Sequence, residues 1–186
     1  LLHRRGARVI FVTTAGFEDV LFIQRMNRRH HYSFEWEKPE PLVKRYDCLG
    51  IRERIDARGR VQVPLGSGEM ERLASNIEKR LQESPGQDAS IAVCLLFSYL
   101  NPEHELALKG YLASKFPAIP LSISHEVAPI WREYERGSTT VVDAFIKPIL
   151  IRYVERVRGG LDPLGAPGPG ASVRSEGGRG GAAAGE

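Results

Sequence analysis

The amino-acid sequence predicts an α/β protein with a mixed or mostly parallel sheet and flanking helices. Strand and helix signals alternate along residues 1–158 in the order β-α-ββ-α-β-α-β-α. Residues 8–14 and 89–97 are rich in β-branched and aliphatic residues, which is typical of buried strands. Residues 67–81 carry apolar side chains three or four positions apart, which predicts an amphipathic helix. These elements are numerous enough to enclose a hydrophobic core.

The first half of the chain adds a short helix, a loop and a hairpin. Residues 17–26 place apolar side chains on one helical face, which predicts a short amphipathic helix. Residues 27–41 are polar and aromatic and end with two prolines, so we expect an irregular loop. Residues 47–56 and 61–63 predict two strands, and the turn residues Asp56–Gly59 between them predict a hairpin.

The second half of the chain carries clear helix-start signals. Ser67 is the expected N-cap of the helix at residues 67–81. Asn101, followed by proline and glutamate, is expected to open a helix that runs to residue 116. Residues 119–124 predict a strand. Residues 139–157 predict the last helix, in which Pro148 is expected to cause a kink.

The composition excludes several classes of protein. Hydrophobic residues make up 42% and charged residues 26%, which is a globular balance. The net charge is only +3, so composition gives no case for a nucleic-acid binder. The longest apolar run, residues 91–97, is far shorter than the roughly 20 residues of a membrane span. The two cysteines stand singly, which fits a reducing compartment such as the cytoplasm.

The composition changes abruptly at residue 159. From there to the last residue the chain consists mainly of glycine, alanine and proline, with almost no large apolar side chains. Such a segment cannot bury enough surface to offset its ordering entropy, so we expect a folded part at 1–158 and a disordered tail at 159–186. The tail resembles a GC-rich reading frame translated out of register, which favours a frameshift or a gene-fragment boundary over a natural linker.

Ligands of α/β proteins gather at the carboxyl ends of strands, and this rule selects the first candidate site residues. Thr13 and Thr14 lie at the end of the first strand, and Ser124 lies at the end of the last one. We expect these three to bind substrate or nucleotide. Glu126 follows closely and is a candidate catalytic group, although it can instead be a structural partner of a nearby arginine.

Helix N-termini bind anions, and the segment before the last predicted helix supplies the other candidates. Arg136 is the second candidate catalytic residue. Both Arg132 and Arg136 can pair with a carboxylate or phosphate of a ligand. Ser138, Thr139 and Thr140 are expected to bind phosphate at the start of the helix. The alternative for these three residues is a plain helix cap.

A basic and aromatic segment, Arg25–Trp36, resembles RNA-binding loops, but an exposed loop that docks on a neighbouring surface is the preferred interpretation. His30 and His31 suggest a metal ligand pair. Adjacent side chains rarely bind one ion, however, and no third ligand has a suitable spacing, so we expect no metal site.

Five segments in a fixed order resemble the hydantoinase A / 5-oxoprolinase family, and the chain is most similar to its N-methylhydantoinase-type A subunits. The segments are Arg4–Arg28, Lys38–Val43, Glu53–Val61, Ala92–Glu105 and Ser122–Leu150. They span nearly all of the predicted folded part.

The resemblance implies ATP-dependent hydrolysis of small cyclic amides such as hydantoins and 5-oxoproline. It implies that ATP phosphorylates the amide oxygen, that magnesium neutralises the phosphates, and that the A subunit works with a B-type subunit. The implied fold is a lobe of an actin-like ATPase, related to ribonuclease H. Carboxylases of acetone and acetophenone are among the relatives of the family.

The chain also departs from the family pattern. Family members begin with a strand and a phosphate loop of the D-x-G-G-T-F-T-D type, and this chain starts after both. We therefore expect an internal fragment of an A subunit that is inactive alone, binds ATP and magnesium only weakly, and pairs with the rest of the A subunit and with a B-type subunit. The alternatives are a non-catalytic module that binds a B-type subunit, and an RNA-binding domain that uses Arg25–Trp36.

Overall fold

The computed structural model describes residues 6–25 and 39–161. The chain divides into two units, Leu1–Arg152 and Tyr153–Glu186. The sheet, the hydrophobic core and the candidate site all lie in the first unit. The described part of the second unit is the last portion of one helix.

Four parallel strands form the main sheet, in the order β2-β1-β5-β6. They are β1 (Arg8–Thr14), β2 (Cys48–Ile51), β5 (Ala89–Cys94) and β6 (Leu121–Ile123). The chain runs from β1 to β2 on one side and later returns to β5 on the other side of β1. The carboxyl ends of β1 and β5 therefore form the switch point at which α/β sheets commonly bind ligands.

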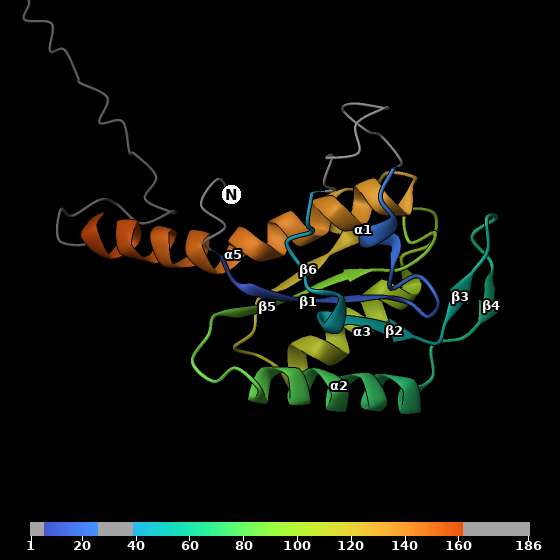
Figure 1. Ribbon diagram of the computed structural model, residues 1–186, viewed down its shortest axis with the longest axis horizontal. Helices are drawn as coiled ribbons and strands as arrows, with labels where there is room; N and C mark the ends of the chain where they lie inside the picture. Colours follow the sequence, from blue (N-terminus) through green and yellow to red (C-terminus); the bar gives the residue numbers. More distant parts are fainter. Residues whose placement is uncertain (1–5, 26–38, 162–186) are drawn as a thin grey trace, which may run out of the picture. The chain divides into compact units, whose positions relative to one another are not determined.

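Helices cover both faces of this sheet (Figure 1). On one face lie α2 (Ser67–Gln82) and α3 (Glu103–Lys115). On the other lie α1 (Val20–Ile23) and the part of α5 (Glu133–Leu161) that belongs to the first unit. Alternate side chains of β1 pack against the helices on the two faces of the sheet, because successive residues of a strand point to opposite faces. Ile10 packs in the cluster with α2 and α3, whereas Phe11 packs in the cluster with α1 and α5.

The two outer strands of the main sheet are each approached by long side chains. At β2, the Arg72 guanidinium donates to the Gly50 carbonyl oxygen over 3.2 Å. At β6, the Lys147 ammonium donates to the Leu121 carbonyl oxygen over 2.9 Å. Backbone acceptors on both edge strands are thus bonded to charged side chains of α2 and α5.

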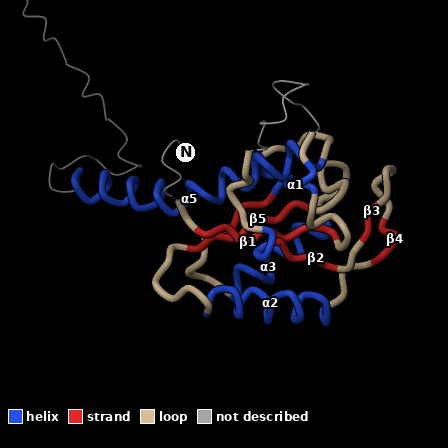
Figure 2. Tube along the Cα trace, in the orientation of Figure 1, coloured by secondary structure: helices blue, strands red, loops and turns tan. Residues whose placement is uncertain are grey.

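A separate two-stranded sheet stands beside the main one (Figure 2) and consists of β3 (Arg54–Ile55) and β4 (Val61–Val63). The predicted hairpin is confirmed, and its turn contains Gly59 at φ 75°. The Asp56 carboxylate accepts hydrogen bonds from the backbone and side chain of Arg60 and from the Arg58 backbone. These bonds lower the pKa of Asp56 to about 2.

Other sequence predictions are corrected at the element ends. The single strand predicted at 47–56 is interrupted, because Glu53 turns into the core between β2 and β3. The strand predicted at 89–97 ends at Cys94, where side chains replace a neighbouring strand as hydrogen-bond partners. The helix predicted from Thr139 begins at Glu133 instead.

Helix capping also differs from the prediction, because Gly66 rather than Ser67 is the N-cap of α2. The Asn101 side chain does accept a hydrogen bond from the Glu103 backbone at the start of α3. The helix predicted at 17–26 is limited to α1. Residues 26–38, with both candidate histidines, and the predicted tail from residue 162 on lie outside the described residues, and residues 159–161 belong to α5.

The α3 helix provides a matched pair for testing the core. Leu108 is 0% exposed in the main cluster, whereas Leu106 is 49% exposed on the same helix. We expect Leu108→Ala to lower the free energy of unfolding by about 2–5 kcal/mol, because it removes buried methyl groups and leaves a cavity. Leu106→Ala should change it by less than about 0.5 kcal/mol. Urea denaturation followed by circular dichroism measures both, and equal effects would contradict this packing.

Candidate functional site

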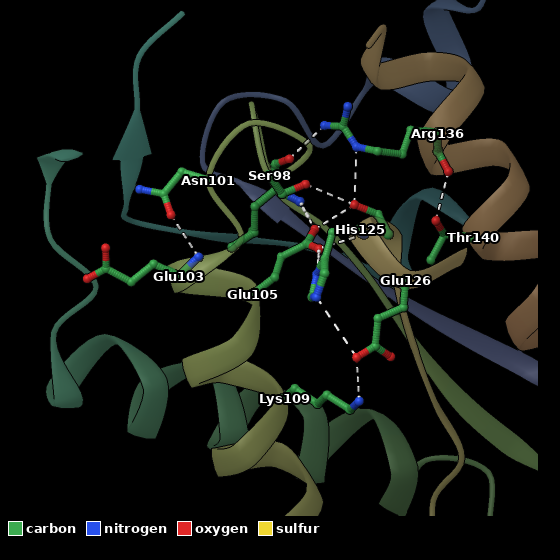
Figure 3. A network of polar contacts seen from close by, with 11 residues as sticks. Ser98, Asn101, Glu103, Glu105, Lys109, His125, Glu126, Arg136 and Thr140 are labelled. Atoms are coloured by element: carbon green, nitrogen blue, oxygen red, sulfur yellow. Dashed lines mark hydrogen bonds and ion pairs between the residues drawn. The ribbon is translucent and has the colours of Figure 1, made fainter. Parts of the chain in front are cut away.

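A network of buried polar side chains lies at the carboxyl ends of β1, β5 and β6 (Figure 3). We call it the carboxyl-edge network. It joins side chains from α3, α4 (Ser124–Val127), α5 and the β2–β3 connection to the backbone that follows β5. Its members are Thr14, Glu53, Leu95, Leu96, Ser98, His104, Glu105, Ser124, His125 and Arg136.

Glu105 is the acceptor at the centre of the network. It lies in the first turn of α3 and is fully buried. One carboxylate oxygen accepts from the Leu95 backbone N–H at 2.8 Å and from the Ser124 hydroxyl at 2.6 Å. The other accepts from the His125 backbone N–H at 3.0 Å and from the His125 ring Nδ1 at 2.7 Å. A single buried carboxylate thus ties β5 to the residues that follow β6.

Arg136 is the opposite charge in the network and is only 1% exposed. Its Nε donates to the Ser124 hydroxyl at 3.1 Å, Nη1 to the Ile130 carbonyl at 2.9 Å, and Nη2 to the Leu95 carbonyl at 2.7 Å. Since the Ser124 hydroxyl donates to Glu105, it connects the guanidinium to the carboxylate. Burial of the two charges is offset by these hydrogen bonds and by their mutual attraction.

A second glutamate–histidine pair, Glu53 and His104, is bonded to the end of β1 through Thr14. The His104 ring Nδ1 lies 2.7 Å from the Glu53 carboxylate, and both side chains are buried. Thr14 donates its hydroxyl proton to Glu53 and accepts a 3.0 Å hydrogen bond from the Leu96 backbone. The switch point between β1 and β5 is therefore fixed by side chains on both sides.

The segment after β5 is held in an uncommon conformation. Both backbone polar groups of Leu95 are bonded to charged side chains, and Phe97 has a φ of 55°, in the left-handed region. Positive φ costs free energy in non-glycine residues, and such residues keep it when surrounding contacts hold the backbone in place. Such preorganisation is typical of loops that bind a ligand.

Charged side chains that can reach a ligand lie on the outer side of the network. Glu126 and Lys109 are partly exposed and form a 2.5 Å ion pair. The Arg132 guanidinium lies 4.6 Å from the centre of the exposed Trp131 ring and forms a long ion pair with Glu135. These groups are exposed to solvent, unlike the buried charges of the network.

Three predicted site residues, Thr14, Ser124 and Arg136, meet in the network. Thr13 is buried beside Thr14, in register with Gly50 on β2 and Cys94 on β5. Glu126 lies next to His125, outside the network. Ligand contact by any of them stays a prediction.

The predicted phosphate site at a helix start is wrong in its geometry. Ser138, Thr139 and Thr140 lie in the second turn of α5, because this helix begins at Glu133. The hydroxyls of Thr139 and Thr140 donate to the carbonyl oxygens four residues earlier, and Ser138 lines a surface cavity of about 230 Å³. No free N-terminal N–H groups are available at this position.

Sequence reasoning missed Glu53, Glu105 and His125 as members of the site. One signal for Glu105 was available, because it lies three positions before Leu108 and seven before Leu112, on the buried face of α3. A charged residue on an apolar helix face needs a buried partner. Nothing in the sequence identified that partner.

Neither cysteine has the character of a nucleophile. Burial raises the pKa of Cys48 to about 12 and that of Cys94 to about 11, so both remain thiols at neutral pH. Within residues 6–25 and 39–161, no three potential ligands are grouped so as to hold a metal ion, and no helix is long and apolar enough to cross a membrane.

Comparisons with known proteins agree with this architecture. Residues 1–116 match the family model for the hydantoinase/oxoprolinase N-terminal region. The chain is 34% identical over 161 residues to the acetophenone carboxylase gamma subunit of Aromatoleum aromaticum, covering 79% of this chain and 21% of that protein. It is 30% identical over 180 residues to caprolactamase subunit alpha of Pseudomonas jessenii, covering 96% of this chain and 25% of that protein.

Structural similarity extends over most of the chain. The crystal structure of the ATP-dependent caprolactamase from Pseudomonas jessenii superposes with a TM-score of 0.78 at 29% identity, over 90% of this chain and 24% of that one. The predicted fold class, a mostly parallel sheet with flanking helices, is confirmed. The chain spans about a quarter of the length of these relatives. By its sequence and fold, the chain belongs to the hydantoinase/oxoprolinase family.

Proposed function

We propose that this chain is a fragment of an A subunit that opens small cyclic amides at the expense of ATP. The observation that carries the proposal is the likeness to the caprolactamase, a relative described as ATP-dependent, in both sequence and fold. An amide carbonyl is a poor electrophile, and phosphorylation of its oxygen makes ring opening feasible. The acetophenone carboxylase relative shows that the same region also serves in a carboxylase.

The described residues fit a supporting role in such an enzyme. The carboxyl-edge network fixes the backbone at the switch point. Thr14, Ser124 and Arg136 belong to this network, and Thr13 is buried beside Thr14. Glu126 and Arg132 are exposed enough to touch a ligand above it. Magnesium, which the family resemblance implies, would neutralise the phosphates of the nucleotide.

We also propose that the protein works in the cytoplasm with the remainder of the A subunit and a B-type subunit. Two relatives are named as subunits, caprolactamase alpha and acetophenone carboxylase gamma. Ile130 and Trp131, before α5, are exposed apolar side chains suited to a contact with another polypeptide. The free, buried cysteines suit a reducing compartment.

The chain alone is expected to bind ATP weakly and not to hydrolyse it. A triphosphate needs a cradle of backbone N–H groups and closure by a second lobe. Among the described residues, the nearest approach to such a cradle is Gly66–Gly68, where the chain passes from β4 into α2, and no lysine lies beside it. Isolated phosphate contacts give a Kd of about 1 mM, or about 4 kcal/mol. Isothermal titration with ATP and magnesium tests this. A Kd in the low micromolar range would contradict the proposed incompleteness.

A chimera tests the proposed function itself. Residues 1–158 of this chain would replace the matching region of caprolactamase subunit alpha, which is assembled with its natural partners. We expect ATP-dependent caprolactamase activity within about tenfold of the parent, because the folds agree closely. A folded, assembled chimera without activity would contradict the proposal. An unrelated domain of similar length in the same position is the negative control.

A further inference from the structure

His125 differs from the other described side chains of the network. Its ring is bonded to Glu105 through one nitrogen, while its other side is partly exposed to solvent. Its Nδ1 lies 2.7 Å from the Glu105 carboxylate, and its backbone N–H donates to the same oxygen. Since the carboxylate can only accept, Nδ1 carries the proton of this hydrogen bond. The other ring nitrogen, Nε2, is then the position at which a proton can be gained or lost.

The Nε2 atom faces the outer side of the network. Figure 3 shows the imidazole between Glu105 and Glu126. The nearest Glu126 oxygen is 3.9 Å from Nε2, which is beyond hydrogen-bonding distance, and Glu126 is instead bonded to Lys109. The His125 side chain is 14% exposed, and the Glu126–Lys109 pair beside it lies at the surface. A ligand can therefore reach Nε2 by displacing this partly exposed ion pair.

The second glutamate–histidine pair of the network serves as an internal comparison. His104 and Glu53 have the same 2.7 Å contact through Nδ1, but the His104 side chain is only 4% exposed. That pair is closed to solvent and fits a structural role. The two glutamate–histidine pairs share one geometry but differ in solvent exposure of the histidine. The more exposed pair, Glu105–His125, is therefore the candidate for contact with a ligand.

We propose that His125 is a proton-transfer residue of the ring-opening reaction and that Glu105 is its positioning residue. This inference rests on the proposed function. The arrangement has the elements of a general base, namely a nitrogen that can accept a proton and a carboxylate that orients the ring. It lies at the carboxyl end of β6, next to the switch point where ligands of such sheets bind.

The proposed step conserves atoms and charge. The oxygen of a water molecule bonds to the carbonyl carbon, whose oxygen carries the phosphate, and the carbon–nitrogen bond of the ring breaks. This leaves an acyl phosphate, which a second water molecule hydrolyses to the carboxylate and inorganic phosphate. One proton of the first water passes to Nε2 and from there to the departing ring nitrogen. The imidazole is regenerated, and nothing is oxidised or reduced. Glu105 compensates the imidazolium charge while it exists.

Four charged groups surround this imidazole. Glu105 bonds to it directly, Glu126 lies beside it, Lys109 neutralises Glu126, and Arg136 acts on Glu105 through Ser124. A variant of Glu105 would disturb the buried network and the fold together. The first test therefore uses the chain without a change in that network.

The protonation of His125 can be read directly by ¹⁵N NMR of the ring nitrogens in the full chain, with His125→Gln to assign the signals. We expect the neutral ring to carry its proton on Nδ1, because Nδ1 donates to the Glu105 carboxylate and leaves Nε2 as the acceptor. A neutral form that carries its proton on Nε2 would overturn the proposal, whether or not the chimera is active.

The second test measures turnover in the active chimera. His125→Gln is expected to lower kcat by at least about 100-fold, with KM changed less than threefold. Lys115→Gln, at the exposed end of α3, is the control that keeps parent activity. Unchanged kcat in His125→Gln would overturn the inference but leave the proposed function standing. An inactive parent chimera would count against the proposed function alone, and the NMR result then decides the inference.

Discussion

Replacing Arg136 by alanine is expected to lower the free energy of unfolding by about 3–5 kcal/mol. The substitution removes three hydrogen bonds from a fully buried guanidinium, including those that bind the carbonyl groups of Leu95 and Ile130. It also leaves the buried Glu105 carboxylate without its positive counterpart. Chemical denaturation with matched circular dichroism and fluorescence measures the change.

Arg132→Ala is the matched control, because it removes the same side chain four residues earlier. Arg132 is half-exposed and its ion pair with Glu135 is long. We expect a change of less than about 0.5 kcal/mol, as for most surface ion pairs. If Arg136→Ala were equally mild, Arg136 would not be part of a buried network. A loss of activity without a loss of stability in the chimera would support the catalytic role predicted from the sequence.

Glu105→Ala is expected to cost a similar amount, about 3–5 kcal/mol, because four donors lose one shared acceptor. Glu126→Ala is the control, since Glu126 is partly exposed and paired only at the surface. Both are measured in the same denaturation series. A small effect of Glu105→Ala would mean that water or another group replaces the carboxylate without loss.

The double variant Glu105→Ala/Arg136→Ala should be less destabilised than the sum of the two single variants, by at least about 1 kcal/mol. The reason is that each single variant leaves an opposite charge buried, while the double variant leaves neither. Ser124 connects the two side chains and gives this coupling a structural route. If the losses of unfolding free energy in the two single variants simply added in the double variant, the proposed coupling of Glu105 and Arg136 through Ser124 would be contradicted.

The fold was largely predictable because its strands and helices follow local rules. Arg8–Thr14 is a strand in the predicted place, and the hairpin and the α2 and α3 helices are present where periodicity and turn residues predicted them. The site was predictable only in part. Strand-end reasoning found Thr14 and Ser124, since carboxyl ends of parallel strands meet at one edge.

The remaining site residues depend on contacts between distant parts of the chain. Glu53 meets His104, and Glu105 meets His125, only after the sheet has formed. The early start of α5 was missed for a related reason. The helix follows Arg132, whose φ of 78° is a backbone state that local propensity does not favour, and Arg136 is held in the first turn by carbonyl groups of other segments.

The charged side chains at the outer strands of the main sheet limit how this protein can associate. Exposed strand edges recruit further strands, which is the usual path to polymerisation and amyloid-like aggregation. Here Arg72 and Lys147 bond to backbone acceptors of β2 and β6, so an incoming strand would have to displace charged groups. Another subunit should therefore bind through side-chain contacts rather than by adding a strand to this sheet. Such binding does not lead to aggregation by strand addition.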